Sequence, residues 1–163
     1  MPTVSNTSPI FNLASIGRLN LLHEQCGGIW IPQAVKTELR GIPDGAVRNL
    51  IDEATKAGWL KLRDAADTNL VSLLTVELHR GEAEAIALAL QMHANPLLID
   101  EKEGRATARL LGLQVAGVLG VLIRGKKMGQ IKAVKPEIDA LRTKAGFFVA
   151  PALEDAILAQ AGE

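Results

Sequence analysis

The sequence predicts a three-layer α/β/α fold with a central parallel sheet, and two observations support this prediction. Of the 163 residues, 48% are hydrophobic but only 3% are aromatic, so the core must consist of aliphatic side chains. Aliphatic strands buried on both faces are typical of a parallel sheet that is covered by helices. In addition, the segment 80–115 has the pattern helix, strand, helix, strand: RGEAEAIALALQMHANPLLIDEKEGRATARLLGLQV. This alternation is typical of β-α-β units.

Local signals place the other elements along the chain. Ser8 is expected to cap a helix whose first position is Pro9, because serine and proline are preferred at these two positions. Gly27 and Gly28 interrupt the chain before a second strand. Strands are expected at residues 2–6, 29–31, 59–62, 95–99 and 114–115, and helices at residues 9–22, 33–39, 47–57, 67–78, 82–93, 118–127, 136–145 and 152–161, with a further helix beginning at Asp100.

Length and composition restrict the class of protein. The length predicts a single domain over residues 1–163, with the C-terminal helices at 136–161 packing on its core. No secretory leader is expected before the first strand, and the longest apolar run, GLQVAGVLGVLI, is too short to cross a membrane. The only cysteine, Cys26, excludes an internal disulfide and fits a reducing compartment. We therefore expect a cytoplasmic protein that does not enter a membrane.

Four polar residues lie at the expected strand-to-helix junctions or on early helices: Asn6, Glu38, Glu82 and Asp100. Each has an ordinary structural explanation. Asn6 can form an Asx turn, and Glu38 can be a solvated surface acid. Glu82 can interact favourably with a helix dipole, and Asp100 can form a capping box with Glu103. A functional interpretation therefore depends on all four lying together at the carboxyl edge of the sheet, where ligands bind in open α/β folds.

The helix expected at residues 82–93 carries two acids, and only one of them can face inward. Glu82 and Glu84 are two positions apart, so they point roughly 200° apart around the helix axis. The stripe through Glu82 continues with apolar residues such as Ile86, whereas the stripe through Glu84 reaches Gln91. We therefore expect Glu82 to face the edge of the sheet and Glu84 to face solvent.

The sequence resembles the PIN domain in four stretches that follow one another in the order SNTSPIFNLASIGRLNLL, IPQAVKTEL, RGEAEAIALAL and LLIDEKEGRATARLLGLQV. It is most similar to compact prokaryotic PIN-like proteins that are predicted to bind nucleic acid and are related to VapC-type toxins. The similarity covers nearly the whole chain, and it implies a metal-dependent endoribonuclease. It also implies that the catalytic and metal-binding residues are Asn6, Glu38, Glu82 and Asp100, supported by the hydroxyl of Ser8.

The chemistry of phosphodiester hydrolysis agrees with such a residue set. Carboxylates hold Mg²⁺ or Mn²⁺, which makes a water molecule nucleophilic and neutralises the leaving oxygen. Without the ion, neighbouring carboxylates raise one another's pKa, so we expect metal to stabilise the fold. Asn6 departs from the aspartate that is usual in the family and removes one negative charge, for which Glu84 or Glu101 can partly compensate.

The resemblance also implies partners. Because the formal net charge is zero, any RNA site must be a local patch, and Lys36, Lys102 and Arg105 are candidates for phosphate contacts near the cleft. Each of them can equally be a solvated surface charge. PIN-like toxins usually form homodimers and are inhibited by a small antitoxin. We expect a homodimer that uses an apolar stripe of the first helices, although such a stripe is also typical of a core: Leu13, Ile16, Leu19 and Leu22.

Two functional hypotheses remain open at this point. In the first, the protein is an RNA-cleaving enzyme that depends on Mg²⁺ or Mn²⁺ and acts as the toxin of a type II toxin–antitoxin pair. In the second, it is a PIN-like module that binds nucleic acid or a partner without cleavage, because Asn6 weakens the metal site. A nucleotide-binding α/β domain of the dinucleotide or P-loop type has no support, because neither glycine-rich motif is present.

Overall fold

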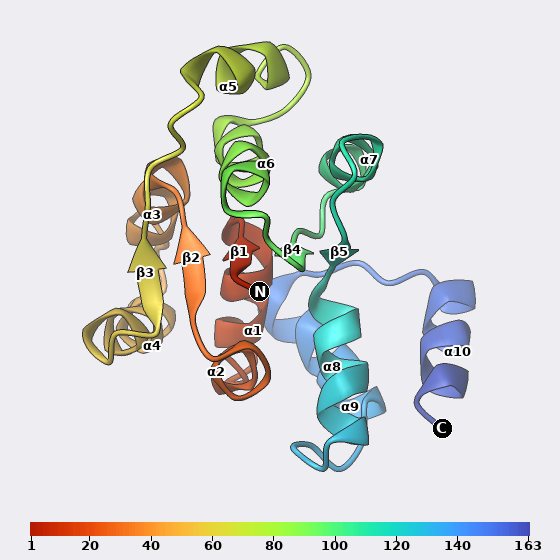
Figure 1. The fold of residues 1–163 in the computed structure, drawn as a ribbon. Helices are drawn as coiled ribbons and strands as arrows, with labels where there is room; N and C mark the ends of the chain where they lie inside the picture. The colour runs from red at the N-terminus through yellow and green to blue at the C-terminus, as the bar shows by residue number, and fades with distance from the viewer.

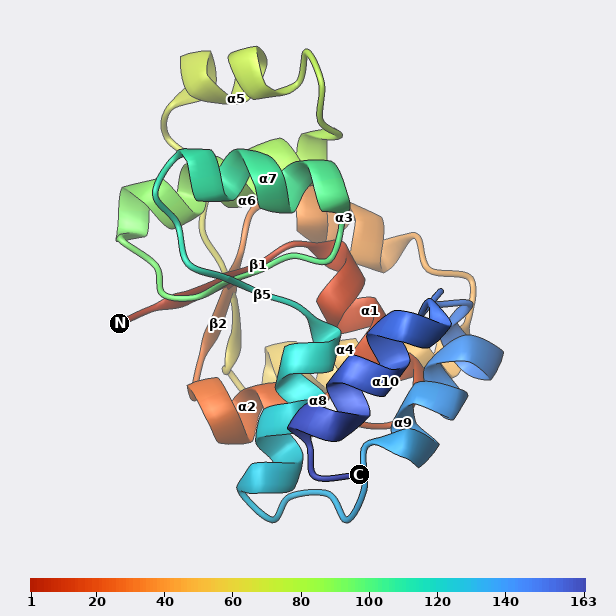
Figure 2. The same cartoon turned by 90° about the vertical axis from the view of Figure 1, so that its right-hand side faces the viewer.

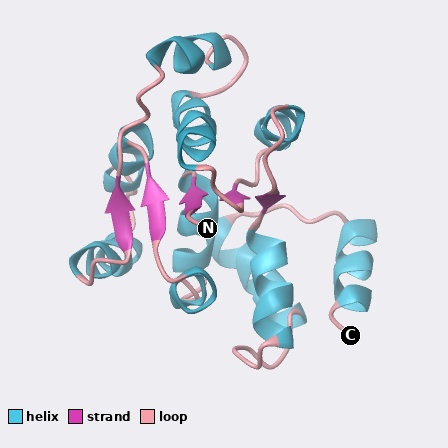
Figure 3. Ribbon diagram, in the orientation of Figure 1, coloured by secondary structure: helices cyan, strands magenta, loops and turns pink.

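The computed structural model describes residues 1–163 and contains a five-stranded, all-parallel sheet with the strand order β3-β2-β1-β4-β5 (Figure 1). All five strands are short (Figure 3). They are β1 (Thr3–Ser5), β2 (Ile29–Ile31), β3 (Leu60–Leu62), β4 (Leu97–Leu98) and β5 (Val115–Ala116). The central strand β1 pairs with β2 on one side and β4 on the other, with Ser5 opposite Leu98. The ends of β1 and β4 therefore reach the same edge of the sheet.

Helices cover both faces of this sheet, which confirms the predicted α/β/α architecture. In Figures 1 and 2, α5, α6 and α7 lie on one face, and α1, α2, α4 and α8 lie on the other. None of the helices combines the length and the apolar character that crossing a membrane requires. The helices are α1 (Thr7–Ser15), α2 (Asn20–Cys26), α3 (Gln33–Arg40), α4 (Gly45–Lys56), α5 (Thr68–Leu74), α6 (Arg80–Met92), α7 (Lys102–Leu110), α8 (Val118–Lys127), α9 (Lys135–Ala140) and α10 (Pro151–Gln160), and a π-helical turn, Leu141–Ala145, follows α9.

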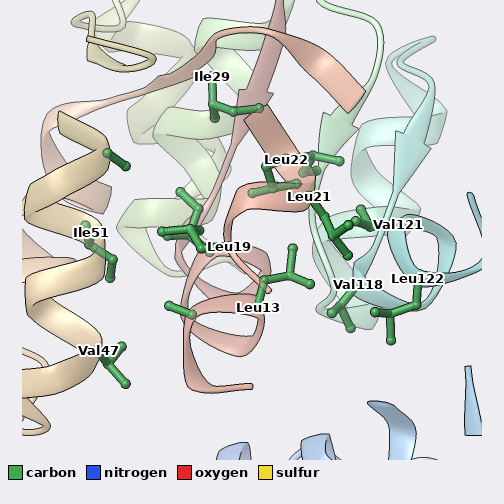
Figure 4. Packing of buried hydrophobic residues seen from close by; sticks show 14 of the residues in the cluster. Leu13, Leu19, Leu21, Leu22, Ile29, Val47, Ile51, Val118, Val121 and Leu122 are labelled. Atoms are coloured by element: carbon green, nitrogen blue, oxygen red, sulfur yellow. The ribbon is translucent and has the colours of Figure 1, made fainter. Parts of the chain in front are cut away.

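The core consists of aliphatic side chains, as the composition predicts. The larger cluster lies between the sheet and the helices α1, α2, α4 and α8, where Leu13, Leu22 and Leu122 are fully buried (Figure 4). The smaller cluster packs α6 against the opposite face. Successive residues after Pro96 alternate between these clusters, because strand side chains point to opposite faces: Leu97 and Ile99 belong to the smaller cluster, and Leu98 to the larger.

Four predicted helix starts are wrong by two residues, and the helix predicted at residues 9–22 is two helices, α1 and α2. Helix α4 begins at Gly45 instead of residue 47, and α6 begins at Arg80 instead of residue 82. At the other two wrong starts, a polar side chain bonds elsewhere. Helix α1 begins at Thr7 instead of Pro9, with Asn6 at the cap position and no capping hydrogen bond from its side chain. The hydroxyl of Ser8 donates to Glu101 instead of capping the helix. Helix α7 begins at Lys102 without the predicted capping box, because Asp100 accepts a hydrogen bond from a different helix.

The apolar stripe that we expected at a dimer interface belongs mainly to the core. Leu13, Leu19 and Leu22 are at most 5% exposed, and Ile16 is half-buried against the same cluster. The helices α1 and α2 that carry the stripe pack against α4, α8 and the π-helical turn. The contacting helices are far apart in the sequence, so the pattern of apolar residues in α1 and α2 does not show that they pack together. A second copy of the chain therefore cannot dock on this face without opening the core.

The C-terminal helix is attached by charged groups and by partly buried apolar side chains, Ile157 and Leu158, that pack against the large cluster. Helix α10 has no fully buried residue, whereas α9 contributes Ile138 to the core. Glu154 of α10 pairs with Lys135 at 2.7 Å and with Arg142. Glu163 accepts a hydrogen bond of 2.7 Å from the backbone N–H of Val134, at the start of α9. Ion pairs and hydrogen bonds near the start of α9 therefore add to the apolar contacts that attach this helix.

Candidate functional site

A polar cavity of about 410 Å³ lies beyond the ends of β1 and β4, and no hydrophobic side chain lines it. The pairing of β1 with β4 brings Asn6, which follows β1, close to the residues that follow β4. Helices α3 and α6, which pack against each other, contribute the remaining acids. The lining consists of Asn6, Thr7, Ser8, Glu38, His79, Arg80, Glu82 and Glu101. Three of the four predicted site residues therefore meet in this cavity, namely Asn6, Glu38 and Glu82.

The side chain of Asn6 holds the carboxylate of Glu101. From the sequence, Glu101 is predicted only as an acid that can compensate for the charge missing at Asn6. Its side-chain Nδ2 donates a hydrogen bond of 2.7 Å to Oε2 of Glu101, and the Ser8 hydroxyl donates to Oε1 of the same carboxylate. Asn6 is only 2% exposed, and its Oδ1 atom is buried without a hydrogen-bond partner. Because buried polar atoms in proteins are almost always satisfied, this oxygen is a candidate for binding a ligand. The Asx-turn explanation for Asn6 is thereby excluded.

Glu38 reaches the cavity from α3. Its Oε2 atom accepts a hydrogen bond of 2.5 Å from the hydroxyl of Thr7. The carboxylate lies directly over Gly81, where an added Cβ would overlap Oε1 of Glu38. Because glycine has no Cβ, the Glu38 carboxylate can occupy this place without shifting.

Glu82 lies in the first turn of α6 and faces the cavity, as the helical pattern predicts. It is 6% exposed, and its Oε1 atom accepts a hydrogen bond of 3.2 Å from the backbone N–H of His79. Its Oε2 atom lies over Gly104, where an added Cβ would be 2.7 Å away. Burial raises the pKa of Glu82, and the negative charge of Glu101 raises it further, although the hydrogen bond from His79 acts in the opposite direction.

Asp100 does not line the cavity. Its Oδ1 atom accepts a hydrogen bond of 3.0 Å from the backbone N–H of Val118, at the start of α8, and its Oδ2 atom is buried without a partner. Burial is the main cause that raises the pKa of Asp100 from 3.8 to about 6, and the charge of Glu101 adds to it. Hydrogen bonding to Val118 and the charge of Arg105 lower this pKa by less.

Glu101 lines the cavity, and its neighbour Asp100 does not. Consecutive residues leaving a strand point in different directions, so only one of two adjacent acids can face the cavity. The sequence shows Asp100 and Glu101 as a pair of acids after an apolar strand, but it does not show their directions.

Glu84 does not face solvent, and our prediction for it is wrong. It is only 8% exposed, and it accepts hydrogen bonds of 3.0 Å from the backbone N–H of Ala34 and 2.7 Å from Nε of Arg80. Ala34 lies in the first turn of α3, where backbone N–H groups have no partner within the helix. Glu84 therefore fixes α3 against α6 and keeps Glu38 beside the cavity.

The predicted RNA contacts occupy different environments. Lys102 is exposed on α7, whereas Arg105 is half-buried and donates a hydrogen bond of 2.9 Å from Nη1 to the carbonyl oxygen of Ile99. Lys36 lines a separate cavity on the other side of α3. Arg80, which was not among the predicted contacts, is the cation that lines the polar cavity. Its position in the first turn of α6, two residues before Glu82, is the only signal in the sequence.

The donor chemistry of the cavity fits a hard divalent cation. Such ions prefer oxygen ligands, and the walls offer carboxylates from Glu38, Glu82 and Glu101 beside the partnerless Oδ1 of Asn6. Two of these carboxylates occupy space that glycines leave open. In the structure the acids bond to protein donors, and no group of three or more Asp, Glu, His or Cys side chains converges closely enough to hold an ion. Ion binding therefore requires these side chains to move towards one another.

A comparison with known proteins identifies the family. A search of curated proteins finds no match. A family model described as a PIN domain matches residues 2–163. Because the match covers almost the whole chain, the protein belongs to the PIN-domain family, whose members are in general nucleases that use divalent metal ions.

Proposed function

We propose that the protein is a metal-dependent endoribonuclease that hydrolyses RNA phosphodiester bonds. The observation that carries this proposal is the polar cavity, which three carboxylates line together with Asn6, whose buried amide oxygen has no partner. The nuclease character of the PIN-domain family supports the same reaction class. The raised pKa of Glu82 is a further feature that is common at catalytic sites.

In this proposal Asn6, Glu38, Glu82 and Glu101 would hold Mg²⁺ or Mn²⁺. A bound ion of this kind neutralises charge on the phosphodiester and lowers the pKa of a water molecule. Asn6 and Ser8 position the Glu101 carboxylate, and Thr7 positions that of Glu38. Burial raises the pKa of Glu82, so this carboxylate holds a proton more readily than an exposed glutamate does.

The guanidinium group of Arg80 supplies positive charge at the rim of the cavity. Its Nε atom pairs with Glu84 at 2.7 Å, and 70% of its side chain is exposed. Arginine binds phosphate through several N–H groups at once. The exposed part of the Arg80 side chain can therefore hold the RNA backbone while Glu84 fixes its Nε atom.

A second candidate function is RNA or partner binding without cleavage. The observation that favours it is that the acids do not converge in the structure, together with an amide at position 6, where the family usually has an aspartate. Both features weaken metal binding. A cleavage assay separates the two functions.

The decisive experiment incubates the purified full chain with structured and unstructured RNA in Mn²⁺ and then in EDTA. We expect cleavage that EDTA stops and that Glu82→Gln or Glu101→Gln lowers at least about 100-fold, since each substitution removes a carboxylate from the cavity. The control is Glu53→Gln, because Glu53 is exposed on α4 and has no side-chain hydrogen bond. Cleavage that survives EDTA or both substitutions contradicts the proposal. Binding without cleavage supports the second candidate.

We further propose that the protein is the cytoplasmic toxin of a type II toxin–antitoxin pair, and that it forms a homodimer and binds a small antitoxin. The resemblance to VapC-type toxins supports this role. Large apolar side chains that remain exposed offer surface for a partner: Leu73, Val76 and Leu110 are 68%, 79% and 88% exposed. Expression of the chain alone should arrest growth of the host, and expression of the Glu82→Gln variant should not. Sedimentation velocity measures the state of association.

A further inference from the structure

A second cavity of about 410 Å³ lies between α3, α4 and the strands β2 and β3. Ile31 of β2 and Leu60 of β3 contribute to its lining. Lys36 and Arg40 come from α3, and Arg48 comes from α4. None of the residues that line the polar cavity takes part in this one, so the two cavities are separate.

Helix α3 forms a wall of both cavities. Lys36 and Arg40 are four residues apart and therefore lie on the same face of the helix, whereas Glu38 lies roughly 200° away from each of them. Glu38 lines the polar cavity, and the two cations line the second one. A ligand in the second cavity is therefore only one helix away from the candidate catalytic acids.

The cations of the second cavity have no protein partner. Lys36, Arg40 and Arg48 make no ion pair, and their side chains donate no hydrogen bond. Asp52 is the only acid in the lining. Five cations elsewhere in the chain form ion pairs, for example Arg18 with Glu137 and Lys126 with Glu163. The second cavity therefore carries an excess of positive charge that an anion would neutralise.

The remaining lining is suited to a flat, partly apolar group. Ile31, Leu39, Ile51 and Leu60 form an apolar floor, and the side chains of Asn49 and Thr55 can exchange hydrogen bonds with a ligand. The volume falls within the range of small-molecule sites, roughly 300–1,000 Å³. Phosphate chemistry at the cationic rim together with a base on the apolar floor describes a nucleotide.

We infer that this cavity binds a phosphate-bearing nucleotide, with the phosphate held by Arg40 and Arg48 and the base lying on the apolar floor. The nucleotide is either free or one residue of an RNA strand whose neighbouring part reaches the polar cavity. Only the binding of an RNA strand rests on the proposed nuclease function. Binding of a free nucleotide depends on the second cavity alone.

The test measures affinity with three probes by isothermal titration calorimetry, using the full chain in EDTA. The probes are AMP, adenosine and a ten-nucleotide RNA whose 2′-O-methyl groups prevent cleavage. The variant is Arg40→Gln/Arg48→Gln. The matched control is Lys132→Gln/Lys144→Gln, which removes two charges from exposed side chains outside both cavities. Circular dichroism and thermal unfolding verify that both variants fold.

We expect the Arg40→Gln/Arg48→Gln variant to weaken AMP binding at least about tenfold, because it removes charge-assisted hydrogen bonds to the phosphate. Adenosine should bind more weakly than AMP to the unmodified chain. If the variant also binds the RNA probe more weakly, the site accepts an RNA strand. In that case the slope of log K for RNA binding against log salt concentration should become less steep by about 0.7 for each phosphate that the variant no longer neutralises. If only AMP binding weakens, the ligand is a free nucleotide.

Equal affinities in the variant and in the matched control, for both AMP and RNA, overturn the inference. Adenosine binding as tightly as AMP overturns it as well, because the phosphate then contributes nothing. The Glu82→Gln variant separates this result from the proposed function. It should bind AMP as the unmodified chain does while losing metal-dependent cleavage. If the unmodified chain binds AMP but shows no metal-dependent cleavage, only the nuclease proposal is contradicted.

Discussion

The acids at the carboxyl edge of the sheet and the acids at the C-terminus have opposite electrostatic environments. At the C-terminus, Glu154 pairs with Arg142 and Lys135, and these hydrogen bonds lower its pKa to about 2. The hydrogen bond from the Val134 N–H is the main cause that lowers the pKa of Glu163. At the sheet edge, burial raises the pKa values of Glu82 and Asp100, and neither acid forms an ion pair.

This difference separates acids that hold the fold together from acids that the fold must accommodate. A paired carboxylate stabilises the folded state in its charged form. A buried carboxylate without a cation destabilises it at neutral pH, and such groups concentrate at functional sites. The C-terminal acids attach α10, whereas the edge acids are available to a positively charged ligand.

The largest effect that this comparison predicts concerns Asp100 and pH. Its folded-state pKa of about 6 lies above the ordinary 3.8, so the folded protein binds this proton more tightly than the unfolded chain does. The resulting stability is fully present below pH 3.8 and is lost as the pH rises through about 6. At 1.36 kcal/mol per pKa unit, the loss is roughly 3 kcal/mol. Asp100→Asn should therefore raise the free energy of unfolding at pH 7 in EDTA.

The measurement is urea unfolding between pH 4 and pH 7, with Glu154→Gln as the contrasting variant. The pKa of Glu154 is lowered, so the stability that this carboxylate contributes to the fold is present above pH 4.5. This contribution is lost as the pH falls through about 2. Glu154→Gln should therefore lower stability at neutral pH, opposite in sign to Asp100→Asn. The same sign for both substitutions contradicts the contrast between the two regions.

A second prediction converts the amide of the edge cluster into an acid. Asn6→Asp replaces the donor that holds Glu101 at 2.7 Å with a second negative charge. Loss of this charge-assisted hydrogen bond should cost about 2 kcal/mol in EDTA, which corresponds to a fall of roughly 4–8 °C in Tm for a chain of this size. Mn²⁺ should raise the Tm of the variant more than that of the unmodified chain, because the added carboxylate strengthens the site.

Thermal unfolding with and without Mn²⁺ tests this prediction. Asn69→Asp is the matched control, since Asn69 is exposed on α5 and lies outside the polar cavity. If Asn6→Asp and Asn69→Asp respond alike to EDTA and to Mn²⁺, the edge acids are not an ion site.

The architecture is predictable from the sequence because it depends on local patterns. The apolar run after Pro96 identifies β4, and the acid-bearing start of α6 places Glu82 at the sheet edge, where the structure has it. The end of β1 likewise places Asn6 in the cavity. These inferences need only the periods of strands and helices and the parallel arrangement of the sheet.

The features that the sequence does not predict depend on distant segments. The helical pattern predicts that Glu84 faces solvent because a surface helix exposes one side, but α6 packs against α3, α5 and α7. Whether Asp100 or Glu101 faces the cavity depends on the position of α8, whose Val118 N–H binds Asp100. The sequence also does not show the role of Gly81 and Gly104, because this role depends on the carboxylates of Glu38 and Glu82 that pack against them in the folded chain.

The smallest predicted effect tests one of these glycines. In Gly104→Ala the new Cβ would lie 2.6 Å from Cδ1 of Ile99 and 2.7 Å from Oε2 of Glu82. Overpacking costs about 1–3 kcal/mol, and the higher helix propensity of alanine offsets up to about 1 kcal/mol of this. The net loss of stability should be about 1 kcal/mol. Gly120→Ala in α8 is the control, because an added Cβ there meets nothing within 4 Å, and it should stabilise the fold slightly.

Since Glu82 must shift, Gly104→Ala should also lower RNA cleavage far more than its small effect on Tm explains. Equal cleavage by both alanine variants would show that the position of Glu82 is not critical.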